Sequence, residues 1–493
     1  MGFQAVEYPA GSPPVFEDLS GNTWEPLFHH DCAFGRDNFL EVMMNMIRNP
    51  NVNSSWLFRA DILYEDGPGG TEPSENDAVN RPQIINFKDF TLEKTLVRRL
   101  IPRNTQRDQP LDQTCMVYHG GRSGETEMTL VAYNPHYSSA SEVPFYHPKV
   151  QGLAFLHEWD FSTNQGVISL HYHFFDLEER DPKLARTALS LLTVLYKHGQ
   201  GKVTGYVKRV HHDTIIPQIP VQTTYARLKQ KYARKLIESW AEVTDPAKHV
   251  FEDFGIAAFL IELWAEMYRG ESFPGFIDIG CGNGLLVHIL RQEGYQGWGF
   301  DARKRKSWQQ YGSETDGTSG LKGHPSLREH VLLPHFVQQE PNETDPEEND
   351  GSLLHDGKFP GGTFIISNHA DELTPWTPIL ATASKCPFIM IPCCSHNLTG
   401  AKYRAPAPKQ QNKSQSAYAS LVDWVSQIAT DCGWEVETEM LRIPSTRNTG
   451  LIGRRRKQDY EAIDLDGVME KYGGTHGYVD NVMKLVKQKP RSH

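Results

Sequence analysis

Long apolar runs, paired cysteines and an excess of positive charge are what this sequence lacks. No stretch of 18 or more residues is continuously apolar, so we expect no transmembrane helix and no membrane partner. Residues 1–18 carry acids and prolines where a signal peptide has a basic and then an apolar region, so no secretory leader is predicted. The seven cysteines are odd in number and scattered, which argues against a disulfide framework and for a reducing, cytoplasmic location.

The cysteine spacing also argues against a metal site. No two pairs have the separation typical of zinc ligands, and Cys393 and Cys394 are adjacent, which makes them a poor chelate. We therefore expect no metal cofactor.

The formal net charge of −11 excludes a globally basic nucleic-acid binder. The charge is segregated, however: acids gather at 65–77 and 340–356, whereas bases gather along 224–240 and at 303–306 and 454–457. Local basic clusters permit a polyanionic partner on one face. Taken alone, each cluster is better explained as a solvated surface.

The length of 493 residues favours two domains. Residues 1–205 predict an α+β accessory domain, with a helix at 37–48, a hairpin of strands 153–161 and 166–175, and a helix at 181–197. We interpret the proline-rich residues 206–223 as a linker and 224–457 as a second, α/β domain. Residues 458–493 are predicted to form a basic helical tail.

The second domain alternates apolar strands with helices. Two long helices, at 224–240 and 246–269, precede strands predicted at 276–279, 297–301, 331–336, 362–368, 387–394, 434–443 and 449–453. Such an order predicts a mostly parallel seven-stranded, Rossmann-like sheet that is covered on both faces. The acidic residues 338–362 are expected to form a solvated insertion.

A glycine turn follows the first of these strands. Its sequence is Phe276-Ile-Asp-Ile-Gly-Cys-Gly-Asn-Gly284, and its G-x-G-x-G spacing differs from the G-x-G-x-x-G of dinucleotide sites. Asp278 precedes the turn, and Asp301 ends the next strand. This combination resembles motif I of class I S-adenosylmethionine-dependent methyltransferases; the alternative is an ordinary turn between a strand and a helix. The resemblance implies S-adenosylmethionine as cofactor. The residues expected to bind it are Asp278, Gly280, Cys281, Gly282, Asn283, Gly284, Asp301 and Asn368.

Ligands of open α/β sheets bind at the carboxyl ends of the strands, which points to residues 368–372 and 393–396. Methyl transfer to a hydroxyl requires positioning and one proton acceptor. The candidate catalytic residues are Asp371, His369, His396 and Lys402. The cations that we expect to hold substrate phosphate are Arg103, Arg404 and Arg447.

Each of these assignments has an alternative. The histidines are also explained as structural residues, and Asp371 with Glu372 as caps of the following helix. Cys394 is a conceivable nucleophile, as in carbon-5 methylation of pyrimidines, although thiols at buried strand ends are usually inert.

Several further blocks resemble the tRNA (uracil-O(2)-)-methyltransferase family. They span most of 98–456 and include residues 100–104, 113–115, 224–233, 250–253, 368–376, 392–394 and 441–446. The resemblance implies methylation of the ribose 2′-oxygen of uridine-44 in serine tRNA. The chain departs from the family at Ser395-His-Asn397, where aromatic residues are common. It also has no cysteine beyond Cys432, so the C-terminal zinc finger of some relatives is not expected.

Three hypotheses follow. The first is an RNA 2′-O-methyltransferase whose N-terminal domain and helix 224–240 hold tRNA mainly by its phosphates. The second is a methyltransferase for a protein or a small molecule, because this fold alone does not define the acceptor. The third is a catalytically silent scaffold, against which the intact glycine turn argues. The sequence leaves open whether a partner protein is needed.

Overall fold

The computed structural model describes residues 3–66, 81–105, 107–122, 126–175, 181–205, 212–312, 325–337, 353–408 and 414–487. The chain divides into two compact units, residues 1–208 and 209–493, which are treated separately below. None of the described helices is long and apolar enough to cross a membrane.

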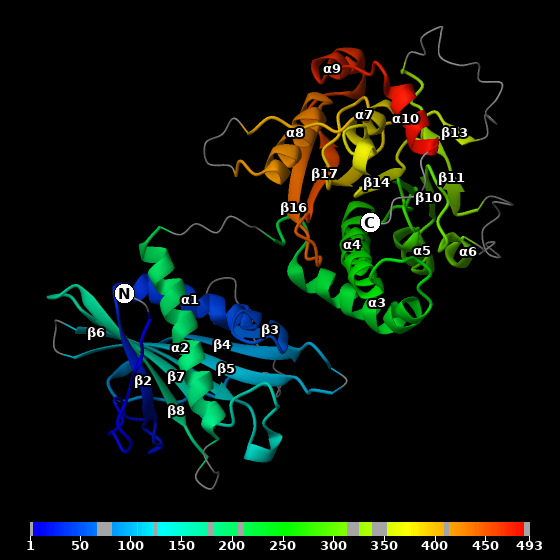
Figure 1. Ribbon diagram of the computed structural model, residues 1–493. Coiled ribbons are helices and arrows are strands. Elements are labelled where there is room, and N and C mark those ends of the chain that lie inside the picture. Colours follow the sequence, from blue (N-terminus) through cyan, green and yellow to red (C-terminus); the bar gives the residue numbers. More distant parts are fainter. Residues whose placement is uncertain are drawn as a thin grey trace. The chain divides into compact units, whose positions relative to one another are not determined.

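The N-terminal unit is an antiparallel sheet of eight strands with two helices packed on it (Figure 1). The strands, in spatial order, are β1 (Val6–Glu7), β2 (Glu25–Cys32), β8 (Gln165–His173), β7 (Gly152–Asp160), β6 (Thr126–Pro135), β5 (Leu111–Arg122), β4 (Phe90–Pro102) and β3 (Leu57–Glu65). The predicted hairpin is confirmed as the pair β7 and β8, which is continuous from Gly152–His173 to Asp160–Gln165.

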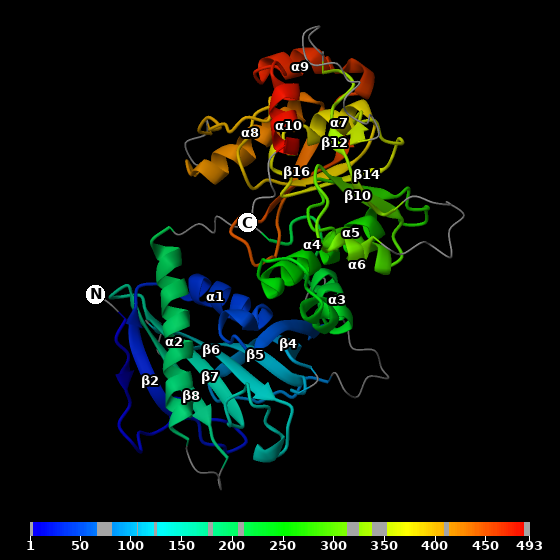
Figure 2. The same cartoon turned by 45° about the vertical axis from the view of Figure 1, so that its right-hand side comes forward.

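Helices α1 (Arg36–Arg48) and α2 (Pro182–Val203) cover one face of this sheet. Figure 2 shows the long helix α2 lying across it. Alternate residues of β5 separate the two faces, because Cys115 and Val117 pack under the helices while Met116 and Tyr118 pack against Trp24 on the other side. Helix α2 starts as predicted, with Asp181 accepting a hydrogen bond from the Lys183 N–H (2.8 Å) and Pro182 in the first turn.

The C-terminal unit contains a sheet of seven strands. Their spatial order is β11 (Leu327–Glu329), β10 (Gly297–Asp301), β9 (Phe276–Ile279), β14 (Phe364–Asn368), β15 (Phe388–Ile391), β17 (Thr449–Arg456) and β16 (Trp434–Met440). The first five strands are parallel to one another, whereas β17 runs antiparallel to both of its neighbours. The sheet is thus mixed, with a single reversed strand.

Helices cover both faces of this sheet. Helices α3 (Gln218–Glu238), α4 (Pro246–Met267) and α5 (Leu285–Gln292) share one hydrophobic core with Phe276 and Phe364. Helices α7 (Thr377–Ala383), α8 (Ala417–Asp431), α9 (Leu465–Lys471) and α10 (Tyr478–Lys487) share the other core with Ile277 and Ile365. A short helix, α6 (Trp308–Tyr311), follows β10. Adjacent strand residues enter opposite cores, which explains the continuously apolar strand sequences.

The third strand was predicted wrongly. We expected it at 331–336, but the strand that pairs with β10 is Leu327–Glu329. Residues Val331–Leu332 (β12) pair instead with Leu354–His355 (β13) in a separate two-stranded sheet. Pro334, which has no N–H to donate to a neighbouring strand, limits the length of an apolar strand here.

The predicted insertion and linker are also shorter than expected. Residues 338–352 lie outside the described residues, but 353–362 include β13 and the buried Phe359, so this end of the insertion belongs to the domain. Residues 218–223, expected in the linker, form the first turns of α3. Pro220 falls in the first turn of that helix, where its missing N–H would have no helical partner in any case.

The predicted basic tail is in fact part of the second domain. Val468, Met469, Tyr478 and Val482 are buried in its core, and the Tyr478 hydroxyl donates to the Leu332 carbonyl oxygen (3.0 Å). Acids slightly outnumber lysine and arginine in 458–493, so the segment is not basic. Its helical pattern alone did not reveal this packing.

Candidate functional site

The glycine turn connects β9 to α5 in a conformation that favours glycine at three positions. Gly280, Gly282 and Gly284 have φ values of +72°, +52° and +76°. The N–H groups of Gly280 and Cys281 both donate to the Phe300 carbonyl oxygen, at 2.8 and 2.9 Å, which ties the turn to β10. The Asn283 side chain accepts a hydrogen bond from the Leu285 N–H (2.9 Å) at the start of α5.

The three glycines differ in what lies beside them. A Cβ atom on Gly284 would lie 2.5 Å from Leu327 Cδ1 on β11, and one on Gly280 would lie 3.1 Å from Ala370 Cβ. A Cβ atom on Gly282 would meet nothing within 4 Å. Gly284 therefore permits close packing, whereas Gly282 borders open space.

Gly284→Ala is expected to lower the free energy of unfolding by about 2 kcal/mol or more, since it adds a clash with Leu327 to the strain of a positive φ. Gly294→Ala is the matched control, because Gly294 also has a positive φ (+92°) but no atom within 4 Å of its added Cβ. Urea unfolding of both variants measures the difference. Equal losses would contradict the packing role of Gly284.

Asp301 lies at the end of β10 and faces the turn. Its Oδ2 accepts a hydrogen bond from the Gly282 N–H (3.1 Å), and its Oδ1 accepts one from the Arg303 N–H (3.1 Å). The Arg305 guanidinium lies 3.8 Å from the same carboxylate. Asp301 is thus held at the mouth of the turn, where the sequence placed the second acid of the cofactor site.

Asp278 is buried one strand away, and its Oδ1 has no hydrogen-bond donor among the described residues. Burial, with the charges of Asp253 and Asp301, raises the pKa of Asp278 well above its ordinary value. An uncompensated buried carboxyl is unfavourable unless a donor or a cation approaches it. The residues present therefore fit a positively charged ligand.

Two acids on α4 belong to the same site, and the sequence analysis did not assign them a role. Asn368, at the end of β14, donates to Asp253 Oδ1 over 3.5 Å, and His369 Nε2 lies 3.2 Å from Glu252 Oε1. Burial and the charge of Glu252 raise the pKa of Asp253 to about 8. The available signal was the occurrence of two consecutive acids in an otherwise apolar stretch of a helix.

His369 is strained as well as paired. Its φ is +53°, and that of Asp371 is +45°, a conformation that is uncommon for residues other than glycine. The Glu252 carboxylate occupies Nε2, whereas the buried Nδ1 has no partner among the described residues. An imidazole that donates from Nε2 keeps Nδ1 as a proton acceptor.

Asp371 contacts the end of β15. The Cys393 thiol donates to Asp371 Oδ1 (2.9 Å), and the Arg447 guanidinium lies 3.6 Å from Cys394 Sγ. The alternative, that Asp371 and Glu372 cap the following helix, is wrong, because α7 begins at Thr377 and has neither a side-chain cap nor an acid in its first turn. Burial, together with the charges of Asp371 and Asp301, raises the pKa of Glu372 to about 7.

The donor atoms of Asp371, Cys393 and Cys394 lie within 4.8 Å of one another, a spacing that a metal ion would accept. Burial and the charge of Asp371 raise the pKa of both thiols, which disfavours the thiolates that a metal requires. The Arg447 cation beside Cys394 also opposes a second cation. The same raised pKa argues against Cys394 as a nucleophile.

The remaining predicted residues are more dispersed. His396 and Lys402 form an isolated β-bridge after β15, and Lys402 and Arg404 are exposed on that loop. Arg103 is exposed in the N-terminal unit, directly after β4. The strand ends thus bring together the glycine turn, Asp301, Asn368 and His369, but not all of the predicted cations.

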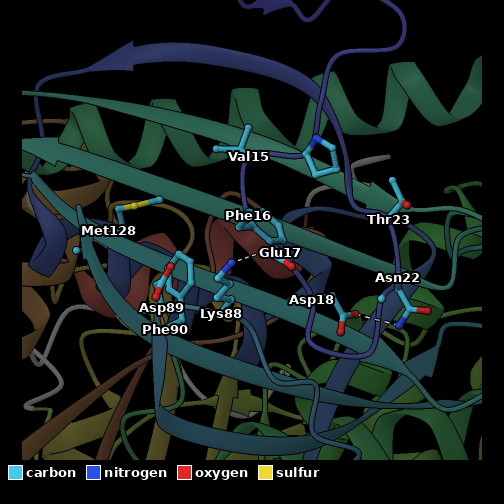
Figure 3. Close-up of a pocket in the computed structure, with 13 residues that line it drawn as sticks. Val15, Phe16, Glu17, Asp18, Asn22, Thr23, Lys88, Asp89, Phe90 and Met128 are labelled. Atoms are coloured by element: carbon cyan, nitrogen blue, oxygen red, sulfur yellow. Dashed lines mark hydrogen bonds and ion pairs between the residues drawn. The ribbon is translucent and has the colours of Figure 1, made fainter. Parts of the chain in front are cut away.

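The N-terminal unit has a separate cavity of about 560 Å³ beside strands β4 and β5 (Figure 3). Three of its charged groups are paired with neighbours: Lys88 with Glu17 (2.9 Å), and Asp18 with Asn22 (2.9 Å) and the Trp24 indole N–H (3.2 Å). Asp18 therefore serves the packing of this unit.

Comparison with known proteins identifies both units. A family described as "TRM44-like, N-terminal bet v1-like domain" matches residues 6–209, and one described as "Predicted AdoMet-dependent methyltransferase" matches residues 216–321. Together with the glycine turn and its two acids, this match defines a methyltransferase domain that uses S-adenosylmethionine as cofactor, preceded by a bet v1-like domain.

The curated relatives narrow the class further. A tRNA (uracil-O(2)-)-methyltransferase of Neurospora crassa is 56% identical over 96% of both chains. Proteins of the same name from Schizosaccharomyces pombe and Saccharomyces cerevisiae are 39% and 36% identical, over 98% and 97% of this chain and 96% and 95% of theirs. The chain belongs to the tRNA (uracil-O(2)-)-methyltransferase family, as the sequence blocks predicted.

Proposed function

We propose that this protein methylates the ribose 2′-oxygen of a uridine in tRNA. The observation that carries the proposal is the meeting of the cofactor turn, Asp301 and the His369–Glu252 pair at adjacent strand ends, in a chain that belongs to this family. Within the same proposal, the acceptor is uridine-44 of serine tRNA, and the mixed sheet is a Rossmann-like sheet with one reversed strand.

Bound S-adenosylmethionine supplies an electrophilic methyl group on a positively charged sulfur. Asp278, with its unpartnered buried oxygen, would provide negative charge toward that cation, and the turn residues Gly280, Cys281, Gly282, Asn283 and Gly284 would hold the cofactor. Asp301 and Asn368 line the site at the ends of β10 and β14. The protein therefore contributes acidic side chains and an accessible glycine backbone to cofactor binding.

We assign the proton of the attacking 2′-hydroxyl to His369 Nδ1. Glu252 Oε1 lies 3.2 Å from Nε2, and the tautomer that donates from Nε2 to this carboxylate presents Nδ1 as an acceptor. Asp371 is the alternative acceptor: its Oδ1 receives the Cys393 thiol, and the second oxygen of a carboxylate is also able to accept a proton. His396 and Lys402 lie on the loop that follows β15 and remain candidates on the acceptor side within this proposal.

The phosphates of the substrate are assigned to arginine and lysine side chains outside the acidic wall. Arg447 is anchored beside Cys394, and Lys402 and Arg404 are exposed on the neighbouring loop, whereas Arg103 belongs to the N-terminal domain. Cations that hold phosphate make RNA binding salt-dependent. A cytoplasmic location is part of the proposal and is supported by the seven free cysteines, which fit a reducing compartment.

The test is to incubate the protein with labelled S-adenosylmethionine and total tRNA and then to map the labelled nucleoside. The proposal predicts label in 2′-O-methyluridine. A serine tRNA transcript with uridine-44 replaced by cytidine tests the finer assignment, which predicts that it accepts no label. Label in protein or in a small molecule would favour the second hypothesis, and no transfer at all would favour a silent scaffold.

Cofactor affinity is expected to depend on pH. Asp253, whose pKa is about 8, is largely neutral at pH 7 in the free protein, and a cationic ligand nearby favours its ionised form. S-adenosylmethionine should therefore bind more tightly as the pH rises toward 8, and the ionisation of Asp253 contributes up to about tenfold per pH unit. Calorimetry between pH 6 and 9 measures it.

S-adenosylhomocysteine is the matched ligand control, because it lacks the sulfonium charge but keeps the amino and carboxyl groups. Its affinity should change less with pH. Asp253→Asn should flatten the dependence for S-adenosylmethionine, and an unchanged slope in that variant would contradict the role of Asp253.

A further inference from the structure

Two aromatic side chains stand exposed together on the N-terminal domain. Trp56, which directly precedes β3, is 48% exposed, and Phe145, in the connection between β6 and β7, is 69% exposed. Their rings are nearly perpendicular (89°), with centroids 5.2 Å apart. Large aromatic side chains that gather at a surface commonly mark a binding site.

Cationic groups accompany the two rings. The Arg107 guanidinium lies over the Trp56 ring, 5.5 Å from its centroid, and is fixed there by two contacts to the Asp108 carboxylate at 3.2 and 3.3 Å. The backbone N–H of Arg103 donates to the Trp56 carbonyl oxygen (2.9 Å). This hydrogen bond places the exposed Arg103 beside Trp56. A surface cavity of about 300 Å³ is lined by Trp56, Arg107, Asp108 and Phe145.

The base of this surface is firmly packed. Leu57, Ala60, Leu100 and Leu111 form a small buried cluster under Tyr137 and Tyr146. The Tyr146 hydroxyl donates to the Gln109 carbonyl oxygen (2.7 Å), which holds residue 146 next to the chain that carries Arg107. The aromatic rings are thus presented by an ordered support, so a ligand need not order them at its own expense.

We propose that this surface, the Trp56–Phe145 platform, binds an unpaired base of the RNA substrate, with Arg103 and Arg107 on the adjoining phosphates. The inference rests on the proposed function and adds a recognition site to it. Exposed aromatic rings stack on bases whose faces are free, and arginine pairs with phosphate. A stable protein interface would need a far larger apolar patch than two rings.

The test measures binding of a labelled tRNA transcript to the full-length protein without cofactor, and methyl transfer separately. Trp56→Ala combined with Phe145→Ala is expected to raise both Kd and KM for tRNA at least about fivefold, the loss expected for stacked bases. The kcat at saturating tRNA and the affinity for S-adenosylmethionine should not change. Trp56→Tyr, which keeps an aromatic face, should restore most of the affinity.

Phe161→Ala is the matched control, since Phe161 is 61% exposed in the turn between β7 and β8 of the same domain. It should bind tRNA as the unmodified protein does. Arg103→Gln and Arg107→Gln should each reduce the dependence of log Kd on log salt by about one.

Unchanged tRNA affinity in the double aromatic variant, or equal losses in that variant and Phe161→Ala, would overturn the platform. Failure of the proposed function has a different signature: the unmodified protein transfers no methyl group to any tRNA. The binding measurement needs no catalysis, so the two failures are distinguishable. If the unmodified protein binds no RNA at all, the platform is refuted as well.

Discussion

Asp278→Ala is expected to abolish S-adenosylmethionine binding, with an affinity loss of at least about 100-fold. The side chain is buried, one of its oxygens has no donor among the described residues, and it lies beside Asp253 and Asp301 in an acidic group. A cationic ligand neutralises the negative charge of this acidic group. Removal of the Asp278 carboxylate removes its attraction to the cation. Isothermal calorimetry with purified protein measures the effect.

The same substitution should not lower the stability of the cofactor-free protein through its charge. Burial raises the pKa of Asp278, so the ionised form is disfavoured in the folded state, and its contribution to stability falls as the pH rises above the ordinary value. Alanine removes this unfavourable effect. Thermal unfolding without cofactor should therefore show no loss near neutral pH, whereas the shift on adding cofactor should disappear.

Asp466→Ala is the control for this experiment, because Asp466 is exposed on α9. It should bind cofactor normally. Unchanged affinity in Asp278→Ala would remove the glycine-turn acid from the cofactor site, and unfolding of the variant at room temperature would show instead that Asp278 acts through the fold.

His369→Gln is expected to lower kcat at least about 100-fold, the loss typical of a removed general base. The affinity for S-adenosylmethionine should stay within about twofold, since His369 is assigned to the acceptor and not to the cofactor. Single-turnover methyl transfer to tRNA measures the chemical step, and equilibrium binding measures both ligands. His198→Gln, an exposed histidine on α2, is the control.

Glu252 is a positioning residue in this scheme, because it acts through the His369 ring at 3.2 Å. Glu252→Gln keeps an oxygen acceptor for Nε2 and should lose less activity than Glu252→Ala, with the loss in kcat and not in KM. Imidazole added to His369→Gly should restore part of the rate. If His369→Gln kept the full rate, the proton acceptor would be Asp371 or His396 instead.

Much of the second domain followed from local pattern. Helices at 246–267 and 417–431 and the strands at 276–279, 297–301, 364–368 and 388–391 were predicted within a few residues, because their apolar periodicity and caps are local properties. The third strand was misplaced because β11 has only three residues, Leu327–Glu329, and gains its place by packing Leu327 against Gly284. That contact joins residues far apart in the chain.

The proline-rich segment and the C-terminal residues were predicted to lie outside the second domain, although both contribute helices to it. Pro220 favours a linker when only composition is considered, although proline is tolerated in the first turn of a helix such as α3. The sequence pattern of α9 and α10 predicts helices but does not indicate which hydrophobic core they join. Tyr478, buried against Leu332, shows that the second domain includes them.

Some features of the candidate site could likewise be predicted from the sequence, whereas others depend on the tertiary structure. The sequence by itself determined the cofactor: the three glycines and the acids Asp278 and Asp301 are near neighbours in the chain, and their spacing is dictated by one turn and the next strand. It also named the strand ends that carry Asn368, His369 and Asp371. Only the tertiary structure placed Glu252 and Asp253 of α4 against those strand ends and Cys393 against Asp371. Such pairings depend on how a helix crosses a sheet and on which strands are neighbours, and packing between distant segments decides both.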